Sequence, residues 1–239
     1  MEKRNPGVAL RLLWGMDAAG TRGPKRGLSV ERIVDAAIAV ADAEGYAALS
    51  MKRVAEELGF TAMSLYRYVD SKTTLIELMS DRVLGLPPAV DPALGWRDGL
   101  RHWAVTEYEL ITRHPWWLEI PMTTPPLGPN NMAWLNTGLT ILERTGLPPG
   151  VRLRLVMNLT LYVIGRMRLS LELGQAEADD DLFDGLFTAM DPQRFPAVLA
   201  AAAAGAFSDA EIDWARADFE FGLDRTLDGY ETYIRGLRP

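Results

Sequence analysis

The sequence has no cysteine and only two histidines among its 239 residues. The lack of cysteine excludes disulfides and thiolate metal sites, and it suits a reducing cytosol. The longest apolar stretch, at about residues 155–173, is interrupted by Asn158, Arg166 and Arg168, so no segment supplies the ~20 apolar residues that cross a bilayer. The first residues also lack the apolar core of a secretion signal. We therefore expect a cytoplasmic protein that makes no membrane contact.

Motifs for catalysis are equally sparse. The chain has no glycine-rich phosphate loop and no G-x-S-x-G turn. An acid–base pair of His102 or His114 with Glu107 or Glu109 is an alternative that rests on residue types alone. We predict a protein without catalytic residues and without a cofactor.

The acidic segment 174–185 is the one candidate for a metal site. Its four aspartates lie close together, but their spacing lacks the alternating oxygen ligands and the distal glutamate of a calcium loop. These residues are Asp179, Asp180, Asp181 and Asp184. A solvated loop fits the composition better, and we predict no metal.

Apolar residues recur at helical spacing along most of the chain, and no alternating segment lies between hairpin signals. The fold class that follows is all-α. After a proline-rich connector at 86–95, proline and glycine divide the remainder into helices. We predict helices at about 96–113, 129–146, 150–174, 192–205 and 209–235, the last with a capping box at 208–211.

Two short helices separated by a glycine occupy residues 49–69. Ser50 is a suitable N-cap for the first helix, and Gly59 can take the left-handed conformation that ends it. Thr61 can cap a second helix at about residues 62–69. This order is typical of a helix-turn-helix that lays its second helix in a DNA groove. An ordinary helical hairpin with the tyrosines in its core is the alternative.

The second helix has the composition of a DNA-reading element. Leu65 and Val69 lie four residues apart and can pack on the first helix, which turns the other side chains outward. Small residues at its start allow close approach to bases, while tyrosine and arginine side chains offer hydrogen-bond donors. We predict phosphate contacts from Lys52, Tyr66, Tyr68 and Lys72, and base-edge positions at Ala62, Met63, Ser64 and Arg67.

The flanks of this segment carry a family resemblance. Ser29 can cap a helix that Gly45 ends, and Ser71 can cap a helix after the motif. The runs RIVDAA, SMKRVAEELG, MSLYRYV and SKTTL follow one another in order and spacing, and over about residues 28–79 the chain resembles the TetR family of bacterial transcriptional regulators. The resemblance implies a three-helix DNA-binding head, followed by a larger helical body that holds a small-molecule effector and forms a dimer.

We therefore expect an N-terminal arm at 1–27, a helix-turn-helix domain at 28–72, and a helical ligand-binding and dimerisation domain at 73–239. Within the arm, residues 8–15 are apolar enough for a short helix, while the basic stretch 22–26 has the charge to contact DNA. A tail that docks its tryptophan-containing segment on the body is equally open.

The net charge of −7 is unexpected for a DNA-binding protein. Its distribution resolves the conflict, because residues 1–82 hold 12 basic and 11 acidic side chains, whereas the rest holds 13 and 21. The acidity therefore lies in the body, where we expect it to repel the phosphate backbone and help to orient the head. Positive side chains cluster around the proposed reading helix and its flanks, and they are Arg22, Lys25, Arg26, Lys52, Arg53, Arg67 and Lys72.

The body is rich in tryptophan and methionine, which suit either a tight core or an apolar ligand cavity. Core filling is the alternative for each residue singly, whereas the resemblance favours a ligand between the helices. We predict a small, largely apolar effector bound by Trp103, His114, Trp117, Met122, Asn131, Trp134, Asn158, Tyr162 and Arg166.

The helices at about 150–174 and 209–235 carry apolar residues on more than one face, so one face can pack on the body and another on a second chain. The TetR resemblance implies that these helices form a four-helix bundle across a two-fold axis, and burial within a single body is the alternative. One short reading helix touches too few bases for specificity, which also favours two heads ~34–36 Å apart.

These observations lead to one functional hypothesis. The chain is a ligand-responsive transcriptional repressor that binds a palindromic, double-stranded DNA operator as a homodimer and is released by a small effector. A helical small-molecule-binding protein or enzyme without a DNA role is one alternative. A helical adaptor that contacts protein through the second motif helix is another.

Overall fold

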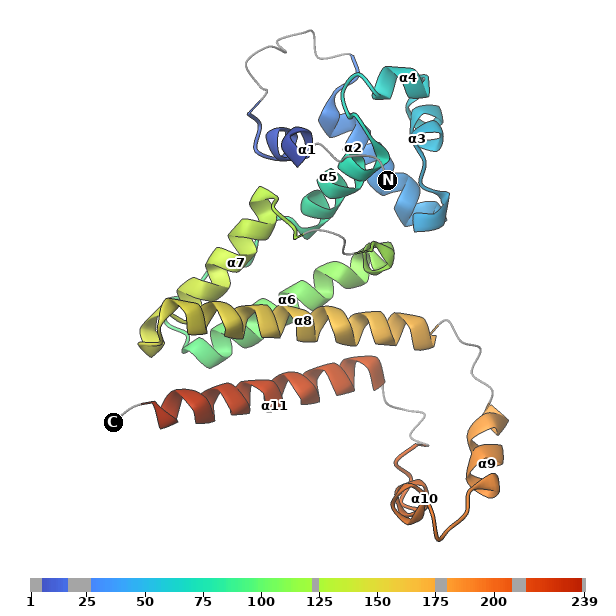
Figure 1. Ribbon diagram of the computed structural model, residues 1–239, viewed down its shortest axis with the longest axis vertical. Helices are drawn as coiled ribbons and strands as arrows, with labels where there is room; N and C mark the ends of the chain where they lie inside the picture. Colours follow the sequence, from blue (N-terminus) through green and yellow to red (C-terminus); the bar gives the residue numbers. More distant parts are fainter. Residues whose placement is uncertain (1–5, 17–26, 122–124, 175–179, 208–213, 238–239) are drawn as a thin grey trace.

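The computed structural model describes residues 6–16, 27–121, 125–174, 180–207 and 214–237 (Figure 1). Throughout these ranges the fold is all-α, as the sequence predicts, and they contain no strand. A head and a larger body lie at opposite ends of the long axis and meet at α5 (Lys72–Leu84) (Figure 1). No helix within the same ranges is both long and apolar enough to span a membrane.

Three helices and their caps build the head: α2 (Val30–Glu44), α3 (Met51–Leu58) and α4 (Ala62–Leu65). Each begins at the hydroxyl residue that the sequence predicts as its N-cap, whose side chain accepts a backbone N–H three residues later. Gly59 ends α3 with a φ of 72°, a left-handed conformation that glycine adopts without steric cost. The 3-10 helix η1 (Tyr46–Ala48) links α2 to α3.

The second motif helix is shorter than predicted, because α4 ends at Leu65 instead of near residue 69. The following residues form a tighter turn, in which the Tyr68 N–H donates to the Leu65 carbonyl three residues earlier (2.9 Å). Two constraints oppose a longer helix here. Val69 is fully buried in the head core, and Ser71 already caps α5. Residues 66–68 therefore project from a turn that follows α4.

The N-terminal segment forms a short helix, α1 (Pro6–Leu13), that packs against α5. Just after it, the Trp14 indole N–H donates to the Leu127 carbonyl, 2.9 Å away. The tryptophan-containing segment is therefore docked, as in the second of the two interpretations of the arm. The basic stretch 22–26 lies outside the described residues.

The body continues the helical series after the connector. Its elements are α6 (Trp96–Arg113), the 3-10 helix η2 (Pro115–Glu119), α7 (Pro129–Ile141), the 3-10 helix η3 (Glu143–Thr145), α8 (Pro149–Gly174), α9 (Asp180–Ala189), α10 (Pro196–Ala203) and α11 (Trp214–Gly236). The long helices α8 and α11 pack side by side, whereas α9 and α10 form an excursion away from them (Figure 1).

Two helix boundaries in the body differ from prediction. α7 ends at Ile141, five residues early, because the chain tightens into η3 before Gly146, whose φ is 76°. α10 begins at Pro196 instead of residue 192, since proline suits the first position of a helix. The predicted capping box at 208–211 lies outside the described residues.

The prediction of a solvated loop at 174–185 is wrong for its second half, where residues 180–185 belong to α9. The sequence places acidic residues at positions 180 and 181, in the first turn of this helix, where the helix dipole favours negative charge. The same carboxylates that suggest a loop are therefore compatible with a helix start. In the described residues no cluster of possible metal ligands occurs.

Two hydrophobic cores hold the described residues together, one in the head and one in the body. α5 contributes to both, with Leu75 and Met79 in the head core and Leu84 in the body core. Trp116 of η2 is also part of the head core, although its neighbour Leu118 packs in the body core. α5 and η2 therefore join the two parts.

Candidate nucleic-acid interface

The residues predicted to meet DNA lie together on α3, α4 and the start of α5. Leu65 and Val69 are completely buried, as predicted, and hold α4 and the following turn against the head core. Met63 is 75% exposed and Tyr66 is 46% exposed. Two large side chains of this segment are therefore open to solvent, as is common where a partner binds. Ala62 and Ser64 are half-buried, while Lys52, Arg67, Tyr68 and Lys72 are exposed.

The charged side chains of this surface differ in whether they already contact another residue of the head. Lys52 lies 3.7 Å from Glu56 in an exposed ion pair, which water and salt weaken. The Lys72 ammonium lies 5.5 Å from the centre of the Tyr46 ring, at the N-terminus of α5. Arg67 makes no hydrogen bond or ion pair with any other residue that the structure describes. Its guanidinium is therefore available to a base or a phosphate.

Arg53 does not belong to the positive surface that the sequence suggests. Its guanidinium bonds to Glu44 on α2 at 2.6 Å and to Glu57 at 2.9 Å. These hydrogen bonds raise the pKa of Arg53 and lower that of Glu44. The residue ties α3 to the end of α2 and keeps little charge for phosphates.

One exposed aromatic of this surface is missing from the sequence prediction. Phe60 lies between α3 and α4 and is 40% exposed. A signal was present, because an aromatic residue directly after the helix-ending Gly59 stands outside the apolar spacing of either helix. Ser64, in contrast, has a second role, since its hydroxyl lies 2.9 Å from the Thr61 hydroxyl.

The predicted effector residues lie in the body core and in contacts between its helices. Trp103 and Trp134 are buried in the body core, with ring centroids 5.4 Å apart in an edge-to-face arrangement. The Trp103 indole donates to the Trp134 carbonyl, and the Trp134 indole donates to the Gly85 carbonyl. Both indole N–H groups already have acceptors within the protein. For this pair, a role in filling the core fits the contacts better than a role in binding a ligand. Met122 lies outside the described residues.

Asn131 holds the start of α7 and does not face an open cavity. The buried Asp81 carboxylate of α5 accepts the backbone N–H of Asn130 at 3.2 Å and of Asn131 at 3.0 Å. It also accepts the Asn131 side-chain amide at 2.8 Å. A Cβ on Gly128 would lie only 2.0 Å from an Asp81 oxygen, so a glycine is required there. Asp81 thus caps α7 from another helix, and α5 and α7 are locked together.

His114 and Trp117 lie at the junction of head and body. Together with side chains of α5 and α6 they line a cavity of only about 10 Å³, which is the size of one water molecule. His114 Nδ1 lies 2.8 Å from the Asp42 carboxylate of α2, and the Trp116 indole donates to the same oxygen at 2.5 Å. The carboxylate therefore joins η2 to the head.

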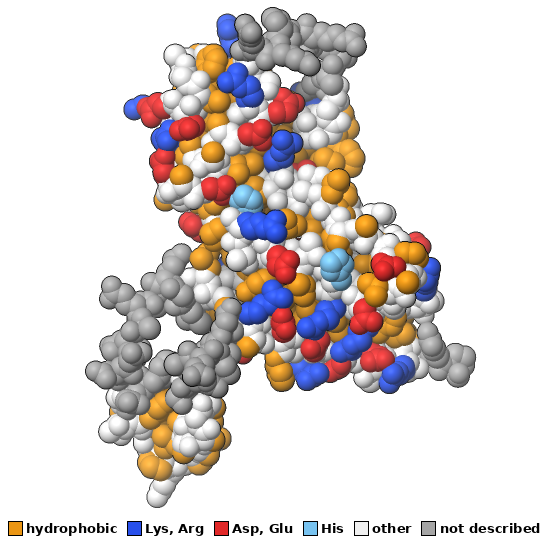
Figure 2. Space-filling view, turned by 180° about the vertical axis from the view of Figure 1, so that it is seen from behind, with side chains coloured by type: hydrophobic (Ala, Val, Ile, Leu, Met, Phe, Trp, Pro, Cys, Tyr) orange, Lys and Arg blue, Asp and Glu red, His pale blue; other side chains and the backbone are white. Residues whose placement is uncertain are grey.

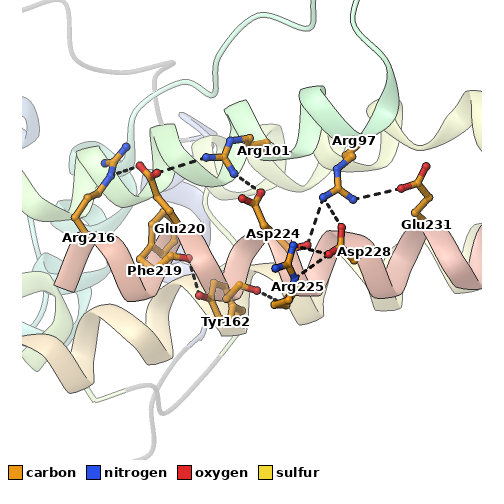
Figure 3. A network of polar contacts seen from close by, with 12 residues as sticks. Arg97, Arg101, Tyr162, Arg216, Phe219, Glu220, Asp224, Arg225, Asp228 and Glu231 are labelled. Carbon is orange, nitrogen blue, oxygen red and sulfur yellow. Dashed lines mark hydrogen bonds and ion pairs between the residues drawn. The ribbon is translucent and has the colours of Figure 1, made fainter. Parts of the chain in front are cut away.

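The remaining predicted residues lie on α8 and bond to α11. Asn158 donates to the Tyr230 hydroxyl at 3.0 Å, and Arg166 bonds to Asp218 at 2.8 Å. The Tyr162 hydroxyl donates to the Phe219 carbonyl at 2.7 Å (Figure 3). These contacts join the two long helices.

A row of ion pairs between α6 and α11 was not predicted (Figure 3). Arg97 pairs with Asp228 at 2.6 Å and with Glu231 at 3.5 Å. Arg101 pairs with Asp224 and, at 3.5 Å, with Glu220. The partners are more than 100 residues apart in sequence, so local spacing gives no signal for them. Figure 2 shows the result as charges of both signs interleaved on this face of the body.

Glu107 is the least expected residue of α6. Its side chain is 5% exposed, and its Oε2 has no hydrogen-bond partner among the described residues. Burial raises the pKa of Glu107 from 4.5 to about 8, so the carboxyl group carries a proton at neutral pH. The acid–base alternative paired it with a histidine, but His114 pairs with Asp42 instead.

Known proteins match both parts of the chain. Residues 33–79 match the family described as bacterial regulatory proteins, tetR family, and residues 88–234 match a domain described as tetracyclin repressor-like, C-terminal domain. The HTH-type transcriptional repressor DrrR1 of Streptomyces coeruleorubidus is 38% identical over 236 residues, which cover 96% of this chain and 87% of that protein. The chain belongs to the TetR family.

Solved structures of other TetR-family proteins superpose on this one. Apo ActR from Streptomyces coelicolor is 26% identical with a TM-score of 0.76, covering 89% of this chain and 99% of ActR. ActR in complex with actinorhodin is 27% identical with a TM-score of 0.75, covering 87% and 99%. The predicted resemblance to TetR proteins is therefore confirmed, and with it the assignment as a transcriptional regulator with a helix-turn-helix.

Proposed function

We propose that this TetR-family regulator is a repressor that binds a palindromic operator as a homodimer and leaves it when a small, largely apolar effector binds the body. The observation that carries the DNA role is the segment around α4. Leu65 and Val69 are fully buried, whereas Met63 and Arg67 are turned outward without partners in the described part of the head. Because its target is DNA, we place its action in the cytoplasm.

The exposed face of α8 supports the dimer. Val156, Leu159 and Val163 are buried in the body, while a second row at four-residue intervals is exposed and apolar. This row comprises Leu153, Met157, Leu161 and Leu169, and Gly165 falls in its one gap with open space around it. Exposed apolar rows of this kind mark contacts with another chain.

α11 offers a matching surface beside it. Phe221 is 65% exposed and Tyr233 is 48% exposed on this helix, which packs against α8. Gly229 lies between them, with open space where a larger residue would carry its Cβ. We place a second copy of the chain against α8 and α11, so that four helices pack across a two-fold axis.

The α9–α10 excursion is consistent with this dimer. α10 is built of proline, alanine, valine and leucine, and none of its residues is buried. Hydrophobic side chains cover the described part of this excursion (Figure 2). Since α9 and α10 connect α8 to α11, we place them against the same second copy.

The effector proposal is supported by the ligands of a relative. ActR has been crystallised with actinorhodin and with (S)-DNPA, and it is 27% identical to this chain in both structures. A body that folds in the same way offers the same kind of response, in which a ligand shifts the population between two arrangements of the heads.

A selection from random duplex DNA, followed by titration in solution, tests the proposed function. We expect an inverted repeat with half-site centres about 10–10.5 bp apart or a multiple of this, bound by one dimer. Recovery of a single half-site bound by a monomer contradicts the dimer. Recovery of no preferred sequence contradicts the repressor.

A further inference from the structure

An open cleft of about 630 Å³ lies between the connector after α5 and the facing sides of α6 and α7. This volume is within the ~300–1,000 Å³ of small-molecule sites. None of the nine residues predicted above to bind the effector lines this cleft. The cleft combines an apolar surface with hydrogen-bonding groups, among them Val90, Trp96, Ile141, His102, Thr137 and Thr140.

Thr137 is the unusual member of this lining. The residue is only 9% exposed, and within the described ranges its side chain makes no hydrogen bond. Its hydroxyl oxygen is not among the fully buried polar atoms, so it stays open to the cleft. Helical threonines elsewhere in the body, such as Thr106 and Thr112, donate to the carbonyl four residues earlier. The Thr137 hydroxyl therefore has no partner of its own in α7 and can bond to a ligand atom in the cleft.

We propose that this cleft is the effector site, and that it takes an uncharged, flat aromatic molecule with hydroxyl or carbonyl groups. Trp96 and Ile141 offer a surface for an aromatic ring, and Thr137 and His102 offer hydrogen bonds at its edge. The charged groups of the rim have both signs, which favours no net charge on the ligand. The inference rests on the proposed function, because it locates the effector of that repressor.

The walls of the cleft are bonded to the end of α5. Trp134 of α7 donates to the Gly85 carbonyl at 3.0 Å, and Asp81 of α5 caps α7. Across the cleft, Arg144 donates to the Pro92 carbonyl of the connector at 2.8 Å. The opposite end of α5 lies in the head core. A ligand that separates α7 from the connector therefore moves the helix that carries the head.

A covalent probe tests this coupling without knowledge of the natural effector. The chain has no cysteine, so Thr140→Cys provides a single thiol on the cleft wall, and Thr112→Cys provides a matched thiol on the exposed side of α6. Both variants are labelled with N-(1-pyrenyl)maleimide and titrated with the selected operator. We expect labelling at position 140 to weaken operator binding about fivefold or more, and labelling at position 112 to leave it unchanged.

The pyrene emission spectrum shows whether the label occupies the cleft, because its vibronic bands respond to apolar surroundings. Unchanged operator affinity with a buried label at position 140 overturns the inference, and so does a label that stays in water. An unlabelled protein that selects no DNA sequence overturns the proposed repressor instead. The ligand chemistry is then decided by a second experiment that uses no DNA.

That experiment compares 1-hydroxypyrene with pyrene by fluorescence titration of the full chain. We expect the wild type to bind 1-hydroxypyrene about 2- to 10-fold more tightly, the range of one hydrogen bond. Thr137→Val should remove this preference and leave pyrene binding unchanged, while Thr112→Val should keep the preference. The same preference in wild type and Thr137→Val overturns the inference, as does the absence of saturable binding. Thermal unfolding of each variant confirms that it is folded.

Discussion

Arg67 and Lys72 lie on the same surface of the head but differ in what they offer DNA. Arg67 follows α4 and has no partner among the described residues, whereas Lys72 starts α5 over the Tyr46 ring. We expect Lys72→Ala to weaken binding on all sequences and to lower the salt slope by about 1. Arg67→Ala should change the sequence preference, because a guanidinium at this place can read a base edge.

Anisotropy titrations over a salt series, on the selected operator and on random DNA, measure both effects. Arg53→Ala is the control, since its charge is already neutralised within the head by Glu44 and Glu57. If Arg67→Ala lowers the affinity for operator and for random DNA equally, then Arg67 contacts phosphate and does not read a base.

Glu107 makes the stability of the protein depend on pH. Its pKa is about 8 in the folded protein against an ordinary value of 4.5, so between these values the folded state holds a proton that the unfolded state releases. The free energy of unfolding therefore falls as the pH rises through this window. Glu107→Gln removes the titration and should be more stable than wild type by about 1–3 kcal/mol near pH 8.

Urea unfolding at a series of pH values measures this difference. At about pH 4, where both states of the wild type are protonated, the two proteins should be similarly stable. A wild type that gains stability between pH 5 and pH 8 relative to Glu107→Gln contradicts the buried neutral carboxyl group.

At the scale of elements, the sequence predicts starts of helices better than their ends. Ser29, Ser50, Thr61 and Ser71 were found because an N-cap is a local interaction between a side chain and the next turn. The end of α4 was misplaced because it depends on the burial of Val69 in the head core, a contact over long sequence distance.

The candidate sites follow the same division. The predicted DNA-contacting residues lie together because they are neighbours on one short segment. The partners of the predicted effector residues could not be foreseen, because they lie far away in sequence, as when Asn131 bonds to Asp81 and Tyr162 bonds to Phe219. The residue types of a sequence can suggest a pocket. Which of the polar groups already has a hydrogen-bond partner depends on the packing of the folded chain.

The cap that Asp81 gives α7 can be tested as a link between elements. Asp81→Ala leaves the first N–H groups of α7 without their acceptor, so we expect a loss of about 2 kcal/mol or more in the free energy of unfolding. Chemical denaturation measures it. Asp91→Ala is the control, because that exposed carboxylate bonds only within its own turn. Equal losses for the two variants contradict the link.

The Trp116 indole of η2 bonds to Asp42 of the head. Trp116→Phe keeps a ring in the head core but removes the donor to Asp42, so we expect it to cost about 1 kcal/mol more than Trp117→Phe. The Trp117 indole N–H is buried without a partner among the described residues, so its loss should cost nothing in hydrogen bonding. Chemical denaturation of both variants measures the difference, and equal costs contradict a bond across the junction.

At the scale of the whole molecule, the exposed apolar row on α8 allows a test of whether the protein is a monomer or a dimer. Leu161 is 58% exposed at the middle of this row, and a charge there would be buried without a partner in a dimer. We expect Leu161→Glu to be monomeric and to lose most of its operator affinity, because a single head makes half of the contacts. Light scattering coupled to size exclusion measures the mass.

Leu86→Glu is the matched control, since Leu86 is 77% exposed and belongs to the connector and not to α8 or α11. It should remain dimeric with unchanged operator affinity. A Leu161→Glu protein that stays dimeric places the interface elsewhere on the molecule.

The edge-to-face pair of Trp103 and Trp134 has an optical consequence. Two indoles 5.4 Å apart at an interplanar angle of 65° couple their electronic transitions and should contribute to the circular dichroism of the protein. Because Trp134 also bonds to Gly85 at the end of α5, a shift of that helix changes the geometry of the pair. A change in this signal on operator or ligand binding should therefore report, without any label, that the helix bearing the head has moved.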